Sequence, residues 1–283
     1  MKTDVFLLIK MKYNTLTKSQ KKLADFVITD PDFVLNQSIT EVADVCKVGE
    51  ATISRFCKDL GFKGYHDFKL AIVRDLPREQ PDEILGNVIT EDDSILIMAK
   101  RILVKNIEAL NETNDMIKED DIRKAVSLMI KANRIVFFGV GSSFNAALEG
   151  YTKFARIIPN VSINSETHMQ LVSASMLSEN DVAVIISYSG STKEIVDIAR
   201  AVKNNGANII CITRFLKSPL TSYSDVSLIC STNERLVHGY SLSMEMTQIY
   251  LLDILYTEYF RKTYEKSIRN KEITSSILLD KLY

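Results

Sequence analysis

Cysteine and histidine are scarce in this chain of 283 residues, and their scarcity limits the chemistry that it can perform. The four cysteines form no Cys-x-x-Cys pair. They lie in segments whose sequence is typical of buried helices or strands: Cys46, Cys57, Cys211 and Cys230. Free cysteine packs as a small apolar side chain, so we expect reduced core thiols rather than a disulfide framework. With three histidines, zinc ligands are also poorly supplied, and we expect no metal and no cofactor.

Long apolar runs and a strong net charge are also absent. The first apolar run, Val5 to Ile9, follows Asp4 and is too short for the core of a signal peptide. No stretch approaches the roughly 18 apolar residues of a membrane span. We therefore expect a cytoplasmic protein. The formal net charge of -1 argues against a uniformly basic protein that coats nucleic acid, but it leaves room for DNA binding by one local surface.

Prolines and charges gather at one place in the chain and suggest a boundary. Residues 76–83 carry two of the five prolines and several charges, which is typical of a linker. Short amphipathic helices are predicted before this segment, and apolar β-type runs that alternate with helices are predicted after residue 134. We predict a helical domain over 1–75, a linker and connecting helix over 76–114, an α/β domain over 115–262 and a helical tail over 263–283.

Capping boxes predict where two of the N-terminal helices begin. At residues 17–20 and 38–41, a hydroxyl is followed three residues later by Gln or Glu, so that each side chain can satisfy the other's backbone N–H. A short turn over 47–49 then leads to a further helix over 51–60. Gly49 can supply a turn or cap geometry there. Two short helices joined in this way indicate a helix-turn-helix.

The second helix of this pair leaves a polar face that suits the major groove of DNA. The face offers small hydroxyls, an Arg able to fork onto a guanine edge and a Lys for phosphate: Thr52, Ser54, Arg55 and Lys58. Residues 47–74 hold six Lys or Arg against three acids, so this region is locally basic. Lys63 and Lys69 flank a wing-like or connecting loop and are expected to grip the DNA backbone. The alternative interpretation is a helical bundle with a solvated polar face.

One run in this region resembles a known family. The sequence SITEVADVCKVGEATISRFCKDLGFKGYHDFK, residues 38–69, resembles the DNA-binding domain of the RpiR/MurR family of bacterial sugar-metabolism regulators, with its pattern xATxxRFxKxLGFxGxxxFK. The family usually has Gly and Ser where this chain has Lys47 and Gly49. This departure affects the usual Ser cap and not the fold, because Gly caps helices tolerably. The resemblance implies that residues 51–60 form the recognition helix and that the partner is a double-stranded DNA operator.

Five short apolar runs predict strands that are buried on both faces. They cover residues 134–140, 161–163, 181–187, 207–213 and 225–230. Helical stretches lie between them. The alternation predicts a three-layer αβα sandwich with a five-stranded parallel sheet, which binds its ligands at the carboxyl ends of the strands.

Two of these strands end in loops that are rich in Gly and Ser. The first loop places Ser142 and Ser143 at a helix start, and the second carries Ser187, Ser189 and Thr192 to another. A helix N-terminus offers free N–H groups and the positive end of a dipole, so such loops can hold a phosphate dianion without any Lys. We therefore expect a phosphate ester as the ligand.

Each loop taken alone has another interpretation. Ser191 and Glu194 also form a capping box, and Ser143 has the character of a plain N-cap. A dinucleotide fingerprint competes for the first loop, because Glu166 follows the next strand, where a ribose-binding acid can sit. It is the weaker hypothesis, because Phe144 occupies the third glycine position of GxGxxG.

The two loops together resemble a second family. The pair GVGSS and SYSGST, with the following KEIVDIARAVKNNGANIICIT, is similar to the SIS (sugar isomerase) domain over about residues 115–262. The stretch 235–256 resembles the last helix of the RpiR/MurR version. The resemblance implies that loop hydroxyls and amides hold the phosphate, at Ser142, Ser143, Ser187, Ser189 and Thr192.

Catalysis is the rival function, because the SIS fold also serves isomerases. Isomerisation needs a base near the substrate carbon and usually an acid to open the sugar ring, for which the candidates are Glu234, His238, Glu245 and His168. Glu234 and His238 follow the last strand and can equally recognise sugar hydroxyls. The sequence predicts a DNA-binding regulator of amino-sugar or related carbohydrate genes, a homodimer or homotetramer with a sugar phosphate as its allosteric effector, and not an enzyme. The alternative is a sugar-phosphate isomerase or a related SIS-domain enzyme.

Overall fold

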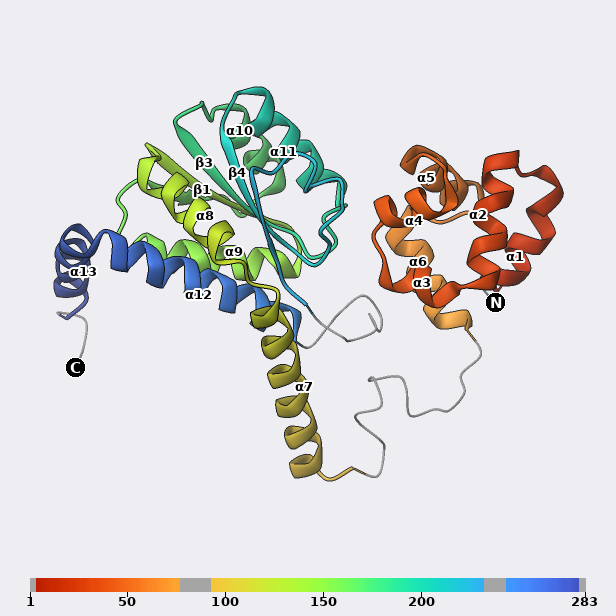
Figure 1. Cartoon of the computed structure of the whole chain (residues 1–283), viewed down its shortest axis with the longest axis horizontal. Helices are drawn as coiled ribbons and strands as arrows, with labels where there is room; N and C mark the ends of the chain where they lie inside the picture. The colour runs from red at the N-terminus through yellow and green to blue at the C-terminus, as the bar shows by residue number, and fades with distance from the viewer. Residues whose placement is uncertain (1–3, 77–92, 232–242, 280–283) are drawn as a thin grey trace. The chain divides into compact units, whose positions relative to one another are not determined.

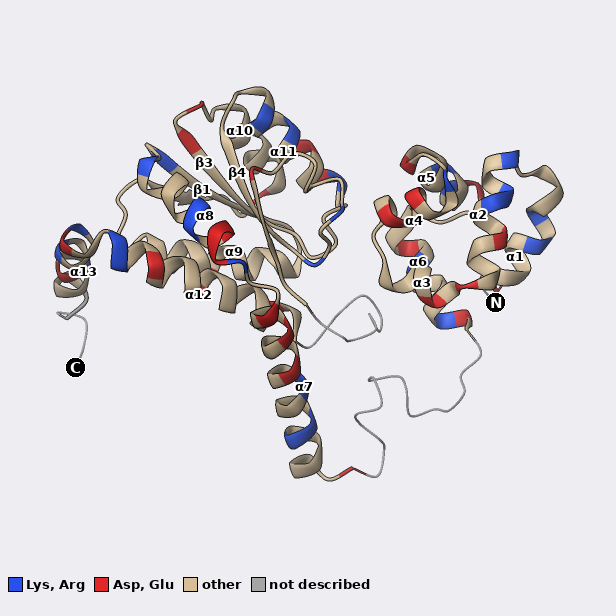
Figure 2. Cartoon of the chain, in the orientation of Figure 1, with Lys and Arg blue, Asp and Glu red and all other residues tan. Residues whose placement is uncertain are grey.

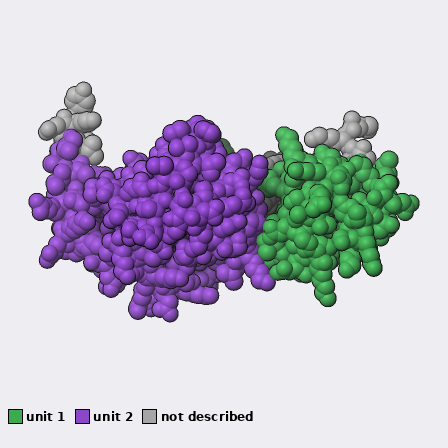
Figure 3. Space-filling model, turned by 90° about the horizontal axis from the view of Figure 1, so that it is seen from above, with its two compact units in different colours: residues 1–105, 233–242 green, residues 106–232, 243–283 purple. Residues whose placement is uncertain are grey.

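The computed structural model describes residues 4–76, 93–231 and 243–279, which Figure 1 draws as ribbons. The chain divides into two compact units, coloured separately in Figure 3. Unit 1 comprises residues 1–105 and 233–242, and unit 2 comprises residues 106–232 and 243–283. Each unit is described by itself.

The helices of unit 1 within residues 4–76 enclose one apolar core. They are α1 (Val5–Lys12), a 3-10 turn η1 (Tyr13–Thr15), α2 (Lys18–Thr29), α3 (Pro31–Asn36), α4 (Ile39–Cys46), α5 (Glu50–Asp59) and α6 (Tyr65–Asp75). Both predicted capping boxes are confirmed, at Thr17 for α2 and at Ser38 for α4. At the centre of the core, the rings of Phe56 and Phe68 meet edge to face with their centroids 5.6 Å apart.

In the turn between α4 and α5, the left-handed residue is Lys47 and not Gly49. Lys47 ends α4 with φ 53°, and its N–H donates to the carbonyls of Ala43 and Asp44. Gly49 has an extended backbone, with φ -81°, and is the N-cap of α5. The glycine therefore caps the second helix, as the sequence analysis allowed, while a lysine makes the tight bend.

Unit 2 follows the predicted alternation of helices and strands, and α7 (Ile95–Asp115) begins within unit 1 and continues into it. Its other elements are α8 (Glu119–Lys131), β1 (Arg134–Gly139), α9 (Ser142–Phe154), β2 (Val161–Ile163), α10 (Thr167–Ser175), β3 (Asp181–Ile186), α11 (Lys193–Asn204), β4 (Asn208–Thr213), β5 (Val226–Ile229), α12 (Met244–Lys262) and α13 (Tyr264–Leu279).

The five strands form one parallel sheet in the order β2-β1-β3-β4-β5, with helices on both faces (Figure 1). Alternate residues of each strand point to opposite faces. Val182 and Val184 of β3 pack in the core with α8, α9 and α12, whereas Ala183 and Ile185 pack in the core with α10 and α11. This arrangement confirms the predicted αβα sandwich.

The C-terminal helix α13 packs against the end of α9. The Asn270 amide donates to the carbonyl of Ile157, and the Thr274 hydroxyl donates to the carbonyl of Arg156. These carbonyls follow the last turn of α9, where intrahelical donors run out. The predicted helical tail is thus part of unit 2. No helix within the described ranges is long and apolar enough to cross a membrane.

Candidate functional site

The two Gly- and Ser-rich loops leave the sheet side by side. Strands β1 and β3 are neighbours, and Gly139 at the end of β1 lies opposite Ile186 at the end of β3. Neighbouring strands are about 4.8 Å apart. The structure therefore brings Ser142 and Ser143, which start α9, to the same edge of the sheet as Ser187, which follows β3.

Glycine is required where the first loop turns from β1 into α9. A Cβ at Gly139 would lie 2.7 Å from the carbonyl oxygen of Ser143, so the helix can begin this close to the strand only above a glycine. Gly141 is the N-cap of α9, with φ 61° and ψ -136°, a conformation that side chains disfavour. The alternative interpretation of Ser143 as an N-cap is therefore wrong.

Behind the first loop lies a glutamine that the sequence analysis missed. Ser143 is only 6% exposed, and its hydroxyl oxygen accepts a long hydrogen bond of 3.5 Å from Nε2 of Gln248 on α12. Gln248 is fully buried, and its Oε1 has no hydrogen-bond partner among the described residues. A second glutamine, Gln170 on α10, exchanges two hydrogen bonds with the backbone of Gly139 and holds the end of β1 in place.

The second loop turns tightly before α11 begins. The N–H of Gly190 donates to the carbonyl of Ser187 over 3.2 Å, and the N–H of Ser191 donates to the hydroxyl of Ser189 over 3.3 Å. Gly190 has φ 60°, and Ser187 is buried while Ser189 is half-buried. Thr192 is the half-buried N-cap of α11, and its side chain makes no capping bond.

The alternative role of Ser191 and Glu194 as a capping box is not what the structure shows. A box that starts at Ser191 needs that residue as the N-cap, whereas the helix begins after Thr192. The start of α11 therefore has no side-chain hydrogen bond to its first N–H groups.

An arginine that the sequence analysis did not consider lies beside the second loop. Arg214 follows β4, and its N–H donates to the carbonyl of Tyr188 within the loop over 3.0 Å. Its guanidinium also donates to the Tyr188 hydroxyl, and the guanidinium carbon lies 5.6 and 5.3 Å from the ring centroids of Tyr188 and Phe215. This arrangement places a fixed positive charge beside a loop that has no Lys or Arg of its own.

The other sequence candidates near the site have different positions. Glu166 accepts hydrogen bonds from the N–H groups of His168 and Met169 as the N-cap of α10, and these bonds lower the pKa of its carboxyl. The acid proposed for a ribose is thus engaged as a helix cap. Glu234 and His238 lie outside the described residues.

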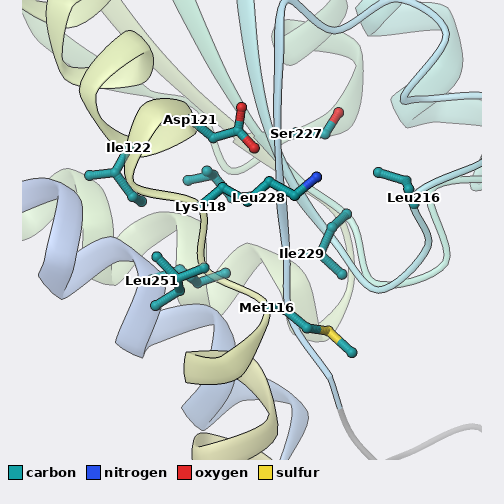
Figure 4. A pocket seen from close by; sticks show the side chains of 10 residues that line it. Met116, Lys118, Asp121, Ile122, Leu216, Ser227, Leu228, Ile229 and Leu251 are labelled. Atoms are coloured by element: carbon teal, nitrogen blue, oxygen red, sulfur yellow. The ribbon is translucent and has the colours of Figure 1, made fainter.

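A pocket lies elsewhere in unit 2, between the start of α8 and β5 (Figure 4). Lys118, Asp121 and Ser227 are its polar lining residues, and its other lining side chains are apolar. None of the predicted site residues lines this pocket. Within the described ranges, no group of three or more His, Cys, Asp or Glu side chains is placed to hold a metal ion.

In unit 1, the residues expected to contact DNA lie mostly at the surface. Arg55 and Lys58 of α5 are exposed, as is Lys63 in the connection to α6. Thr52 and Ser54 are half-buried. Helix α5 begins at Glu50, and its N-cap Gly49 has no side chain that could cap its first N–H groups.

Lys69 contradicts the expectation that it contacts DNA. It is only 7% exposed, and its ammonium donates to the carbonyl of Gln37 over 2.7 Å. The ammonium also lies 5.2 Å from the ring centroid of Tyr65, within range of a cation–π interaction. Lys69 thus ties α6 to the end of α3 and is not available to a phosphate.

Comparisons with known proteins agree on both parts of the chain. Residues 3–79 match the helix-turn-helix domain of the rpiR family, and residues 128–257 match the SIS domain. An uncharacterized HTH-type transcriptional regulator of Caldanaerobacter subterraneus subsp. tengcongensis is 33% identical, over 98% of this chain and 97% of that protein.

The chain is also similar to two proteins with individual names, HexR and NanR. The HTH-type transcriptional regulator HexR of Pseudomonas aeruginosa is 30% identical, over 88% of this chain and 86% of its own. The structure of Vibrio vulnificus NanR complexed with ManNAc-6P has a TM-score of 0.83, with 23% identity over 98% of this chain and 99% of that one. The NanR likeness extends along nearly the whole of both chains and concerns the fold.

Proposed function

Because the chain belongs to the rpiR family of helix-turn-helix transcriptional regulators, we propose that it controls genes of amino-sugar or related carbohydrate metabolism in response to a sugar phosphate. The chain is a transcriptional regulator with a SIS domain and not an enzyme, since its relatives are named as regulators. The isomerase alternative is therefore set aside. The effector, its site and the regulated genes are our proposal, as is a cytoplasmic location.

The start of α9 carries the proposal for the effector. Among the α-helices of the described ranges, α9 alone begins with neither a side-chain capping bond nor an acidic residue in its first turn. Its first N–H groups and its positive dipole end are thus uncompensated, which favours an anion there. The phosphate of the effector is an anion of this kind.

The surroundings of α9 fit a phosphate ester of a sugar. Hydroxyls for the phosphate stand on both loops, at Ser142, Ser143, Ser187, Ser189 and Thr192. Gln248 holds an unpartnered oxygen behind Ser143, which can accept a hydrogen bond from a sugar hydroxyl. NanR was solved with ManNAc-6P, which makes that compound one natural candidate.

Helix α5 is the proposed recognition helix. Arg55 and Lys58 are exposed on it, Thr52 and Ser54 stand beside them, and Lys63 follows the helix. In major-groove complexes, Arg commonly binds guanine edges, whereas Lys commonly neutralises backbone phosphates. Lys69 is not among the proposed DNA contacts, because its ammonium donates to the carbonyl of Gln37 within unit 1.

We propose that the effector acts through differential affinity. In a homodimer or homotetramer, bound sugar phosphate favours one arrangement of the DNA-binding domains, and this changes how their spacing matches operator half-sites. A ligand shifts such an equilibrium only as far as it binds one arrangement better than the other.

The effector site is tested by thermal shift on the full chain, with a panel of sugar phosphates that includes ManNAc-6P. A ligand at 100 times its dissociation constant stabilises the protein by about 2.7 kcal/mol. The variant that combines Ser189→Ala and Thr192→Ala should lose this shift and keep DNA binding. Ser276→Ala, on the exposed side of α13, is the matched control and should respond as the parent does. Unchanged ligand affinity in the double variant contradicts the proposed phosphate loop.

The DNA surface is tested with the promoter beside the gene for this chain, titrated with salt. Arg55→Ala should weaken specific binding by about 1–3 kcal/mol, whereas Lys58→Ala should reduce the salt slope by about one unit. Lys10→Ala removes a positive charge from an exposed position of α1 and serves as the control. If Arg55→Ala binds the promoter as tightly as Lys10→Ala does, α5 is not the recognition helix.

A further inference from the structure

Helix α7 exposes far more apolar surface than a solvated helix usually does. Over its first four turns, large apolar side chains lie on several sides of the helix, and among them Leu96 is 82% exposed, Leu103 58% and Ile107 47%. Ile95, Ile97 and Val104 are exposed as well. Exposed large apolar side chains that gather on one segment mark an interaction surface. This surface therefore indicates that a further element covers α7.

The charges of α7 run against its dipole. Lys100, Arg101 and Lys105 lie toward its N-terminus, whereas Glu108 and Glu112 lie toward its C-terminus, as the blue and red segments of α7 in Figure 2 show. Helices are stabilised by the opposite order, with acids at the N-terminus and bases at the C-terminus. Within a single helix this order of charges is unfavourable. When two such helices run in opposite directions, the basic end of each lies beside the acidic end of the other.

We propose that α7 pairs antiparallel with α7 of a second copy of this chain, around a two-fold axis near Val104 and Ile107. An isologous interface of this kind uses the same patch on both copies. Leu103, Val104 and Ile107 pack at its centre. The opposite directions of the helices bring the basic end of each copy against the acidic end of the other. This charge match selects a second copy over an unrelated partner, because the surface is complementary to itself.

The far half of α7 is held firmly enough to present such a surface. Ala109 and Thr113 are buried against the rest of unit 2, and the hydroxyl of Tyr250 donates to the Asn114 side chain over 2.8 Å. The face that carries Val104 and Ile107 remains exposed beside them. The inference deepens the proposed homo-oligomer by naming the helix that forms it, and it does not depend on which sugar phosphate is bound.

Two variants of the full chain test the pairing by sedimentation or light scattering. The variant with Leu103→Glu and Ile107→Glu should form a smaller assembly, and the dissociation constant between copies should rise at least 100-fold. Met176→Glu should leave both the assembly and this dissociation constant unchanged. Met176 is 68% exposed on another helix end and is the matched control. A parent protein that is monomeric at all concentrations, or a double variant that assembles like the parent, overturns the proposal.

Cysteine cross-linking tests the direction of the helices. The four native cysteines are buried and unpaired, so an introduced thiol is the reactive one. Val104→Cys should form a disulfide between copies, whereas Leu96→Cys should not. In the antiparallel pair the two Leu96 positions are separated by about 28 Å at 1.5 Å per residue. Equal cross-linking at both positions indicates parallel helices and overturns the antiparallel arrangement.

The same variants separate this inference from the proposed function. The proposed effector site lies in the loops of unit 2, so the variant with Leu103→Glu and Ile107→Glu should keep its thermal shift with sugar phosphate. If the variant assembles normally but the parent binds no sugar phosphate, both proposals fail for separate reasons. If the shift persists while the assembly is lost, α7 is the interface and the effector site is intact.

Discussion

Replacing Gly190 by alanine should destabilise the second loop, because Gly190 is buried and has a left-handed backbone. Gly190 has φ 60°, and forcing an alanine into a left-handed conformation costs about 1–2 kcal/mol. The added Cβ would also lie 2.2 Å from the Ser218 hydroxyl oxygen, 2.7 Å from the Ser218 Cβ and 3.1 Å from the Thr213 hydroxyl oxygen. Overpacking of this kind typically costs a further 1–3 kcal/mol. The expected loss in the free energy of unfolding is about 2–5 kcal/mol.

A second glycine separates the strain from the contact. Gly206 also has a positive φ of 80°, but a Cβ there would meet its nearest heavy atom, on Glu179, at an ordinary 3.6 Å. Gly206→Ala should therefore show the strain alone. Adding Ser218→Gly to Gly190→Ala removes both colliding Ser218 atoms and should return part of the loss.

Urea denaturation of the three variants and the parent measures these differences, and a thermal shift with sugar phosphate reports on the loop itself. Gly190→Ala should lower both the stability and the response to ligand, whereas Gly206→Ala should lower only the stability. If Gly190→Ala costs no more than Gly206→Ala, the contact with Ser218 does not exist in solution. If Gly190→Ala binds sugar phosphate as the parent does, the second loop is not part of the effector site.

The remaining predictions concern packing, charge and pH. Gly150→Ala should cost about 1–3 kcal/mol in denaturation experiments, because the helix that carries it has no room for a Cβ against the sheet and α12. Lys69→Met should lower stability by about 1 kcal/mol through the lost hydrogen bond and leave DNA affinity unchanged, whereas Lys58→Met should do the reverse. Burial works to raise the pKa of Asp181, but hydrogen bonds from Arg134 and from Ser178 outweigh it and hold that pKa below its ordinary value of 3.8. The stability that Asp181 contributes should be complete above that ordinary value and disappear as the pH falls below it, and acid titration of Asp181→Asn should lack this step.

Much of the fold could be predicted because its signals are local. The strands are continuous apolar runs, and β3 and β4 lie within one residue of the predicted positions. The two capping boxes at Thr17 and Ser38 depend on residues three positions apart, which the sequence shows directly. The αβα sandwich follows from the alternation itself, since parallel strands need a crossover helix between them.

The partners of the site residues could not be predicted because they come from distant parts of the chain. Gln248 reaches Ser143 across 105 positions, and Arg214 meets Tyr188 across 26. Neither pair has a periodicity or motif that joins its members. Lys69 has the sequence of a surface cation, and only the position of the Gln37 carbonyl turns it inward.

The capping rule succeeded in unit 1 and failed at the second loop of unit 2, and the difference has a physical cause. At Thr17 and Ser38 the chain is free to place its hydroxyl over the first turn of the helix. Before α11, the chain must leave β3 and turn at Gly190 against Ser218, and this fixes the helix start one residue later than the pattern at Ser191 requires. Tertiary structure overrides local preference most often at functional sites. The start of α11 therefore lacks a side-chain cap, as does the start of α9, and the proposed phosphate is an anion that could accept hydrogen bonds from both.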